Sequence, residues 1–389
     1  MGNKVLLGLS GGVDSAVAAY LLKRDGYDVT CCFMRNWDSI ANNDINGNPT
    51  LGGSKCSQEL DYDDAIKVAK QLDLPLLRID FIKEYWDDVF SLFLREYERG
   101  RTPNPDVFCN RYIKFEAFRK YAIDNGFDYI AMGHYAKKVV SKDGYSYLYK
   151  AFDKSKDQSY FLAEVKEEQL KNALFPLADL TKVEVRKIAD EMNLAVAKKK
   201  DSTGVCFIGE RNFKAFLSNY LPAKRGDIVD IVSSRVIGKH DGVLYYTVGQ
   251  HRGLDIGGIQ GYKNEPFFVV GKDVKKNILY VAQEENDYMY SYKCKLTRVN
   301  LIMEEIPSSN FKCKAKFRYR GEDKDVELEY ISEDEAYLHY NRYKYIAKGQ
   351  IAVLYLGERC LGGGVIDEIY REDGSRIEYE RTFLLRTRR

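Results

Sequence analysis

The first third of the chain alternates short apolar runs with segments of helical periodicity. The run KVLLGL at residues 4–9 has the length of a buried strand, and apolar positions at helical spacing follow from Val13 to Lys23, before Gly26. The same patterns predict further strands at 27–34, 76–81 and 128–132, and helices at 61–72, 84–99 and 111–125. Strands that alternate with helices favour a doubly wound parallel sheet, which binds ligands at the carboxyl ends of its strands.

The pattern changes twice farther along the chain. From about 165 to 220 it is helical, and after Pro222 it becomes β-rich, with the short pieces GDIVDI, RVIGKHDG, LYYTVGQH, PFFVVGKD and NILYVAQE. From about 292 onward further strand-like pieces predict a small barrel. The aperiodic segment Trp37 to Ser57 is predicted to be a mobile loop. We therefore expect a multidomain α/β plus β protein with an N-terminal catalytic domain at 1–210, a small β-rich domain at 211–290 and a C-terminal β-barrel with a tail at 291–389.

Composition narrows the class of protein without identifying a partner. Hydrophobic residues make up 45% and charged residues 30% of the chain, and the net charge is only +2. Apolar runs are too short to cross a bilayer and the N-terminus has no secretory pattern, so we expect a cytoplasmic protein with no membrane partner. The eight cysteines form no C-x-x-C pair, which argues against a zinc site or a disulfide framework.

The string S-G-G-V-D-S at 10–15 joins the first predicted strand to the first predicted helix. Gly11 and Gly12 free backbone amides to approach an anion at the helix N-terminus, while Ser10 and Ser15 add hydroxyl donors. Asp14 is suited either to holding a metal-bound water or to positioning a hydrogen-bond donor. The string lacks the lysine of a Walker loop, so it does not predict transfer of a γ-phosphoryl group.

Two cysteines stand in settings that favour a thiolate. Cys109 ends the stretch RTPNPDVFC, where Pro103 and Pro105 predict an extended backbone, and a helix is predicted to begin just after it. Asp106 is close enough in sequence to act as a carboxylate base or as an orienting group. Cys206 follows the basic run KKK at 198–200 and lies between two glycines, in a loop that could swing toward a substrate.

Seven motifs together resemble the tRNA-specific 2-thiouridylase family of the PP-loop ATP pyrophosphatase superfamily. They are SGGVDS, GRTPNPDVFCN, GHYA at 133–136, KDQSYFL at 156–162, DSTGVCFIG, YYTVGQHRGL and CLGGG. The resemblance runs in order from residue 4 to about 366. The tail after Asp367 extends past it and has no assigned role.

The resemblance implies that ATP, with Mg²⁺, activates the 2-carbonyl of a wobble uridine in tRNA, and that sulfur then replaces the oxygen. It implies a persulfide on Cys206, a nucleophilic or resolving role for Cys109, and proton transfer by Asp106, with a cysteine desulfurase or a sulfur-relay protein as donor. The implied ATP-binding residues are Gly8, Leu9, Ser10, Gly11, Gly12, Val13, Asp14, Ser15, Met34 and Gly133. Asn104, Pro105 and Asp106 would meet the flipped-out base, and His134, Lys156, Asp157, Gln158, Arg318, Tyr319 and Gln350 would contact tRNA.

Three other functions remain open from the residues alone. An ATP pyrophosphatase that uses ammonia as nucleophile would share the loop but would not need both cysteines. A tRNA-binding protein without activity would bind RNA without cleaving ATP, and a redox sensor would use the thiols but leave the nucleotide loop idle. The sequence also leaves open which tRNAs are read, the oligomeric state, and whether persulfide or released hydrosulfide attacks the base.

Overall fold

A five-stranded parallel sheet forms the core of the N-terminal part of the chain. The computed structural model describes residues 3–46, 48, 57–201, 212–222, 224–283, 285–306 and 310–379. The sheet has the order β3-β2-β1-β4-β7, and every neighbouring pair is parallel. Its strands are β1 (Lys4–Gly8), β2 (Asp28–Arg35), β3 (Leu76–Asp80), β4 (Tyr129–Ala131) and β7 (Ala173–Leu174). The predicted parallel sheet is confirmed.

Helices cover both faces of this sheet because successive side chains of a strand point to opposite sides. Val5 and Leu7 of β1 pack with α1 (Val13–Arg24), α2 (Ser57–Gln71) and α8 (Lys182–Glu191). Leu6 faces the other way, into an aromatic core built on two longer helical stretches. One runs through α3 (Ile82–Tyr85), the π-helical segment η1 (Trp86–Phe90) and α4 (Ser91–Glu98), and the other through α5 (Pro105–Phe108), the π-helical segment η2 (Cys109–Ala117) and α6 (Phe118–Asp124).

The helical pattern predicted from 165 to 220 is wrong in part. The chain there forms only the short helices α7 (Glu167–Leu170), α8 and α9 (Phe213–Leu217), together with strand β7, and residues 202–211 lie outside the described part. Thr181 caps the start of α8 through a capping box with Glu184, and Asn193, with φ 48°, follows its end. The helix caps and the buried strand β7 therefore interrupt the continuous helical pattern that periodicity alone predicted for this segment.

The segment after Arg35 has no regular helix or strand up to residue 46, as expected of a loop. Its first part is nevertheless packed. Trp37 is buried, its indole N–H donates to Asp44 at 3.0 Å, and its ring lies 4.8 Å from that of Phe90. The described part of the predicted mobile loop is thus anchored on the aromatic core.

The central part of the chain forms a four-stranded sheet. Its order is β10-β11-β8-β9, with β8 and β11 parallel and the other pairs antiparallel. The strands are β8 (Gly226–Asp230), β9 (Val236–His240), β10 (Phe268–Asp273) and β11 (Ile278–Ala282). The piece LYYTVGQH, predicted as β-rich, begins in the short 3₁₀ turn η4 (Val243–Tyr245) and continues as irregular backbone with a turn at 248–249 instead of a strand.

The C-terminal part is a closed barrel, as predicted. Its six strands follow the order β12-β15-β14-β13-β16-β17, and pairing of β12 with β17 closes the ring. They are β12 (Tyr290–Leu301), β13 (Phe311–Lys316), β14 (Lys324–Tyr330), β15 (Glu335–Lys344), β16 (Ile351–Leu356) and β17 (Arg359–Tyr370). Two further 3₁₀ turns, η3 (Ser159–Leu162) and η5 (Asp287–Met289), lie outside it.

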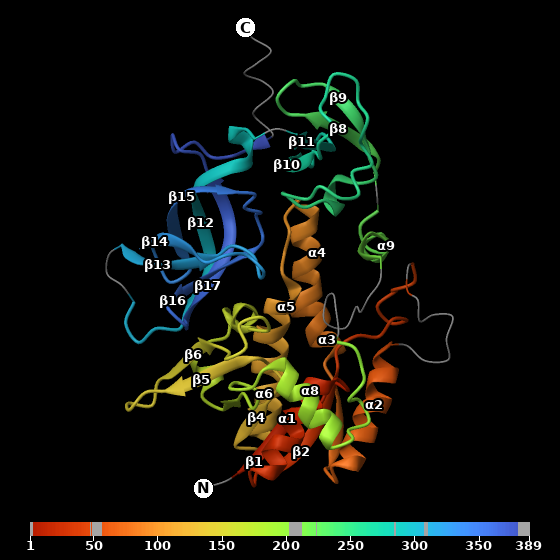
Figure 1. The fold of residues 1–389 in the computed structure, drawn as a ribbon, viewed down its shortest axis with the longest axis vertical. Coiled ribbons are helices and arrows are strands. Elements are labelled where there is room, and N and C mark those ends of the chain that lie inside the picture. The colour runs from red at the N-terminus through yellow and green to blue at the C-terminus, as the bar shows by residue number, and fades with distance from the viewer. Residues whose placement is uncertain are drawn as a thin grey trace.

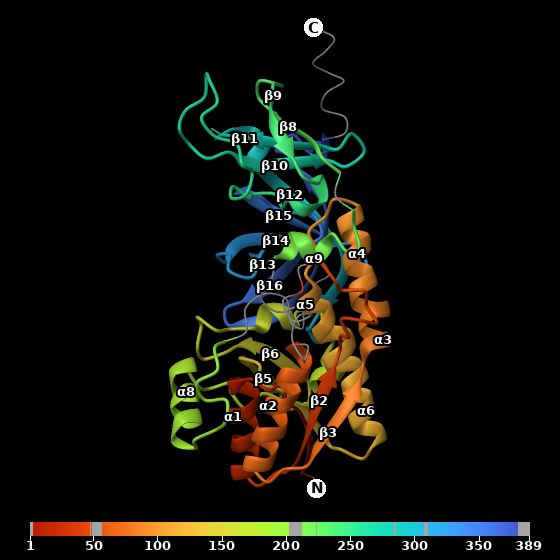
Figure 2. The same ribbon diagram turned by 90° about the vertical axis from the view of Figure 1, so that its right-hand side faces the viewer.

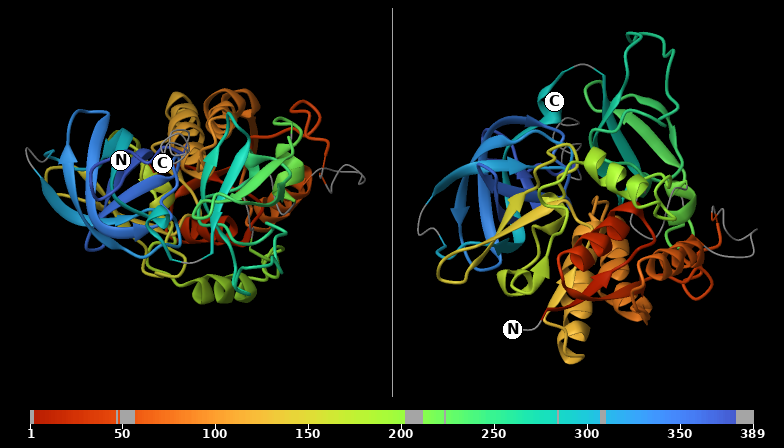
Figure 3. Two further views of the ribbon diagram at one scale, coloured as in Figure 1. Left: turned by 90° about the horizontal axis from the view of Figure 1, so that it is seen from above. Right: turned by 60° about the horizontal axis from the view of Figure 1, so that its bottom comes forward.

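A hairpin from the N-terminal part of the chain extends the barrel sheet. Strands β5 (Ala136–Val140) and β6 (Ser146–Lys150) pair with each other, and β6 also pairs with β17. The hairpin was missed at the sequence level, although Asp143-Gly144 between two strand-like runs is a strong turn signal, and Gly144 has φ 85°. Viewed from above, the barrel and the central sheet lie on opposite sides of the helices of residues 82–124, drawn in orange (Figure 3). Figures 1 and 2 show the barrel and the central sheet above the α/β unit. No described helix combines the length and the apolar character needed to cross a membrane.

A cavity of about 550 Å³ lies where the end of α4, the central sheet and the barrel meet. Lys272 and Lys348 line it, and each amino group donates to a backbone carbonyl, Lys272 to Tyr246 at 2.7 Å and Lys348 to Ile377 at 3.4 Å. Burial lowers the pKa of Lys272 from its ordinary 10.5 to about 7 and also lowers that of Lys348.

Lys272 should make stability increase with pH. Between its folded pKa of about 7 and its unfolded value of 10.5, the unfolded chain holds a proton that the folded chain has lost. The free energy of unfolding should therefore rise through this window, by up to about 1.4 kcal/mol per pH unit. Urea unfolding at pH 7, 8 and 9 measures it. The Lys272→Met variant should have a flatter profile, while the exposed-site control Lys312→Met should keep the wild-type slope; equal slopes in all three proteins would contradict the assignment.

Candidate nucleotide and sulfur-transfer site

The turn after β1 places backbone amides at the N-terminus of α1. Gly11 has φ 74°, and a Cβ atom built on it would lie 2.1 Å from the carbonyl oxygen of Asp61, so only glycine fits there. Ser10 and Ser15 bond each other through their hydroxyls at 3.1 Å, and the Ser15 hydroxyl also lies 3.1 Å from the carbonyl of Gly12. Gly12 is the N-cap of α1 and supplies no side-chain cap, so the first amides of the helix point into the turn without one.

Three other predicted ATP-binding positions lie at the same edge of the sheet. A Cβ atom on Gly133, just beyond β4, would come within 2.8 Å of the backbone nitrogen of Ser15. A Cβ atom on Gly8 would come within 2.8 Å of the terminal methyl of Met34 in β2. The structure thus brings together residues from the ends of three adjacent strands, at the carboxyl edge where parallel sheets bind nucleotides.

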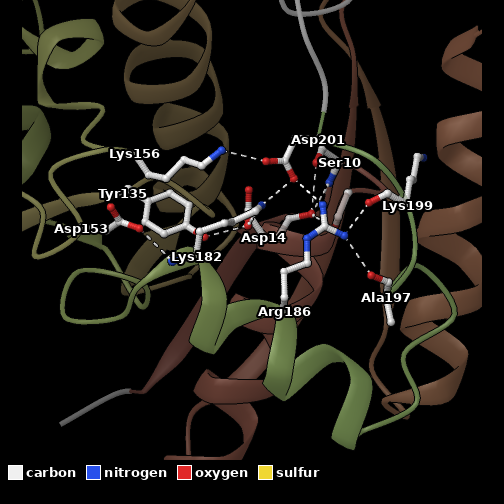
Figure 4. A network of polar contacts seen from close by, with 12 residues as sticks. Ser10, Asp14, Tyr135, Asp153, Lys156, Lys182, Arg186, Ala197, Lys199 and Asp201 are labelled. Carbon is white, nitrogen blue, oxygen red and sulfur yellow. Dashed lines mark hydrogen bonds and ion pairs between the residues drawn. The ribbon is translucent and has the colours of Figure 1, made fainter.

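Asp14 is the centre of a polar network that the sequence did not reveal (Figure 4). Its Oδ1 accepts hydrogen bonds from the Tyr135 hydroxyl at 2.9 Å and from the Lys182 amino group at 2.6 Å. Lys182 also pairs with Asp201 at 2.9 Å, and Asp201 in turn binds Lys156 and Arg186. Burial alone would raise the pKa of Asp201, but hydrogen bonds from Lys156 and Lys182 outweigh burial and hold that pKa well below its usual range.

A second lysine, Lys199, contacts the glycine turn from the segment that leads to Asp201. Lys199 donates to the carbonyl of Gly11 at 3.0 Å and binds Asp61 at 2.7 Å and Asp64 at 2.8 Å. Burial would lower the pKa of Lys199, yet the hydrogen bonds to the two carboxylates raise it. The basic run at 198–200, which precedes Cys206 in the sequence, thus also supports the glycine turn.

Cys109 lies inside a helix and not before its start. The helical stretch begins at Pro105, with Asn104 as N-cap accepting from the amide of Val107 at 3.4 Å. The backbone is extended at Asn104 as predicted, but the predicted helix start at residue 111 is wrong. Proline is favoured at the first helical position and asparagine at the cap, and both signals were present in the sequence. Cys109 is fully buried in this structure, at the first residue of the π-helical segment, and Asp106 lies half-buried in the first turn.

The barrel holds the segment that leads to Cys109. The amide of Thr102 donates to the carbonyl of Lys348 at 2.8 Å, and the hydroxyl of Tyr160 donates to the carbonyl of Ile351 at 2.8 Å. Cys206 lies outside the described residues, so its distance from Cys109 stays a prediction. Asp201, held in the polar network, is the last described residue before it.

The predicted RNA-contacting positions have different environments. Arg318 is exposed and Lys156 half-exposed, whereas His134 is buried beside the Phe115 ring at 6.0 Å, and its Nδ1 has no hydrogen-bond partner in the described part of the chain. Burial, with the nearby charge of Lys114, lowers the pKa of His134 well below 6.5, so the ring is neutral at pH 7. An RNA contact of His134 would therefore require the ring to become accessible.

The other four positions are held by contacts within the protein. Asp157 is buried and accepts from the amide of Ala151 at 3.0 Å, and Gln158 exchanges hydrogen bonds with the backbone of Tyr135. Tyr319 lies with its ring 4.3 Å from that of Phe161, and the carbonyl of Gln350 accepts from the amide of Ile366 at 2.8 Å.

Among the described residues no group of three or more His, Cys, Asp or Glu side chains is arranged to hold a metal ion. Asp14 is the carboxylate nearest the turn, and no hydrogen bond of its Oδ2 is found among the described residues. That oxygen fits a water bound to Mg²⁺ that arrives with a triphosphate.

Comparison with known proteins identifies the family. A family model described as tRNA methyl transferase HUP domain matches residues 3–210, and models described as tRNA methyl transferase PRC-barrel domain and aminomethyltransferase beta-barrel domain match 214–283 and 291–366. A tRNA-specific 2-thiouridylase MnmA of Mycoplasmopsis synoviae is 52% identical over 95% of this chain and 96% of its own length. The chain belongs to the tRNA-specific 2-thiouridylase family.

Two further members of the 2-thiouridylase family match as completely. The protein of this name from Mycoplasma capricolum is 52% identical over 95% of this chain and 100% of its own length, and that from Lysinibacillus sphaericus is 48% identical over 95% and 96%. The relatives' names describe a thiolation, whereas the family model's description names a methyl transfer. The resemblance inferred from the seven motifs is confirmed.

Replacing Gly11 by alanine should lower the free energy of unfolding more than the same replacement at a glycine that also has a positive φ but has room for a Cβ atom. Gly11→Ala combines a left-handed backbone with a clash against the Asp61 carbonyl, and should lower the free energy of unfolding by about 3 kcal/mol or more. Gly126 has φ 75° and open space around its Cβ position, so Gly126→Ala should cost only about 1–2 kcal/mol. Equal losses in urea unfolding would show that the close approach to Asp61 contributes nothing.

Proposed function

We propose that this protein replaces the 2-carbonyl oxygen of a wobble uridine in tRNA with sulfur and consumes ATP as it does so. The observation that carries the proposal is the glycine turn Ser10–Ser15 at the carboxyl edge of the parallel sheet, in a chain about half identical over nearly its whole length to 2-thiouridylases. Members of that family are tRNA-uridine 2-sulfurtransferases.

The first step activates the base. The uracil 2-carbonyl oxygen attacks the α-phosphorus of ATP, the bond from that phosphorus to the oxygen bridging to the β-phosphate breaks, and its electron pair leaves with pyrophosphate. The proton on ring N3 is released. Amides at the N-terminus of α1 face the developing charge on the phosphates. Mg²⁺ bound to the triphosphate would supply additional positive charge, and Asp14 is placed to hold one of its waters.

The second step transfers sulfur. The outer sulfur of a Cys206 persulfide attacks C2 of the base, and the C2–oxygen bond breaks as AMP leaves. Cys109 then attacks the Cys206 sulfur, which breaks the S–S bond, leaves the transferred sulfur on C2 and forms a Cys109–Cys206 disulfide. N3 regains a proton, and a cellular dithiol reduces the disulfide. In the alternative order Cys109 first releases hydrosulfide, which attacks C2; Asp106 assists proton transfer in either order.

Substrate binding divides between the base and the surrounding RNA. Asn104, Pro105 and Asp106 at the start of α5 would receive the flipped-out base, since a stacked base does not expose its carbon to attack. Arg318 carries an exposed positive charge suited to the phosphate backbone, and half-exposed Lys156 could contribute a second one in spite of its ion pair with Asp201. His134, Asp157, Gln158, Tyr319 and Gln350 would shape this surface or contact the RNA after rearrangement. A cysteine desulfurase or a sulfur-relay protein would charge Cys206.

The reaction products test this function directly. The protein with ATP, Mg²⁺, an unmodified tRNA transcript and a persulfide donor should form AMP and pyrophosphate only when tRNA is present, and 2-thiouridine should accumulate. Cys206→Ala and Cys109→Ala should each abolish 2-thiouridine, because one removes the sulfur carrier and the other the resolving thiol. Nucleotide chromatography and mass spectrometry of digested tRNA give the two readouts.

Cys313→Ala is the matched control, because Cys313 is a buried cysteine in the barrel core. It should keep wild-type thiolation. Release of ADP and phosphate, or AMP formation indifferent to tRNA, would contradict the proposed reaction. Thiolation that survives Cys206→Ala would instead point to a different sulfur carrier.

A further inference from the structure

The glycine turn has no lysine in its own sequence, but the fold brings one to it from another helix. Lys182 is the first residue of α8 and lies 168 positions from Asp14, whose Oδ1 its amino group contacts at 2.6 Å. The backbone around Lys182 is fixed by the Thr181 capping box and by a hydrogen bond from its amide to Asp153 at 2.9 Å. Its side chain is only 12% exposed, so it is held at the turn (Figure 4).

Counting donors distinguishes Lys182 from the other lysine at the turn. A lysine ammonium has three N–H donors. Lys199 has all three acceptors it can use, namely the carbonyl of Gly11 and the carboxylates of Asp61 and Asp64. Lys182 binds Asp14 and Asp201, its amino group lies 5.9 Å from the centre of the Tyr135 ring, and its third N–H has no oxygen or nitrogen acceptor among the described residues. The remaining donor lies beside the uncapped N-terminus of α1.

From this geometry we infer that Lys182 binds the β- and γ-phosphates of ATP and stabilises pyrophosphate as it leaves, acting from α8 where a Walker loop would use its own lysine. The inference rests on the proposed function and names a residue for its first step. When the bond from the α-phosphorus to its bridging oxygen breaks, the electron pair moves onto pyrophosphate. A nearly buried ammonium at that position stabilises the charge more strongly than one in water.

The surrounding charges are consistent with a ligand role. Lys156, Lys182 and Arg186 gather around Asp201, and Lys182 and Tyr135 share Asp14. Asp153 is the other carboxylate at this place and accepts from the backbone of Lys182 and from Ser155. Asp201 therefore keeps the Lys182 side chain extended toward Asp14. The two ion pairs use two of the three N–H donors of Lys182, so the third is available to an incoming anion.

Inhibition by pyrophosphate separates a phosphate ligand from a structural ion pair. Lys182→Gln should lower the rate of tRNA-dependent AMP formation by about 100-fold and weaken pyrophosphate inhibition about 10-fold or more, while tRNA affinity stays unchanged. Lys182→Arg should recover part of both effects because it keeps the charge. Lys187→Gln is the matched control, since Lys187 lies on the same helix but is exposed and pairs with Glu191; it should behave as wild type.

Asp201→Asn covers the case in which Lys182→Gln misfolds. This variant weakens the ion pair but keeps the Lys182 ammonium, so a phosphate-binding lysine predicts that pyrophosphate inhibition stays within about threefold of wild type. A structural role predicts that pyrophosphate inhibition weakens about 10-fold or more in Asp201→Asn as well, and that result would overturn the inference. So would a folded Lys182→Gln protein with unchanged pyrophosphate inhibition. A wild-type protein that forms no tRNA-dependent AMP would instead contradict the proposed function, whatever the variants do.

Discussion

The ion pair between Asp14 and Lys182 joins the two ends of the α/β unit. Asp14 belongs to the first turn of α1, directly after the first strand, and Lys182 begins α8, the last helix packed on that face of the sheet. Two charges of opposite sign at the edge of a core interact more strongly than in water, provided that their other hydrogen bonds are also satisfied. Tyr135 adds a hydrogen bond to Asp14 and Asp201 adds one to Lys182, so the glycine turn, the residue before β5 and the chain leading toward Cys206 share one polar framework.

The environment of Cys109 depends on a different part of the molecule. Its helix starts at Asn104, and the residues just before are bonded to the barrel loop at Lys348, while Tyr160 bonds Ile351 at the start of β16. A Cβ atom on Gly349 would lie 3.0 Å from the amide nitrogen of Thr102, so the two backbones are in close contact. The nucleotide end of the site is thus organised within the α/β unit, and the cysteine end is organised against the barrel.

Structural features that depend only on residues close together in the sequence could be predicted from it. Strands β1 to β4, the glycine turn and the barrel strands follow from periodicity and turn chemistry, which are local. Lys182 and Lys199 could not be predicted, because each meets the turn only after the chain has passed through most of the sheet. The helix start at Asn104 was an available signal that the two prolines obscured: proline restricts the residue before it, yet it is also favoured at the first helical position.

Backbone hydrogen bonds cross the border between the α/β unit and the barrel, because Leu148 and Tyr149 of β6 pair with Cys360 and Arg359 of β17. A fragment cut after the α/β unit would leave the outer edge of β6 without its partner, and a fragment containing the barrel alone would expose the matching edge of β17. Unpaired strand edges recruit other strands. The hairpin of the α/β unit and the barrel therefore share one sheet although the central sheet separates them along the chain, and cutting them apart would expose strand edges that the intact chain pairs.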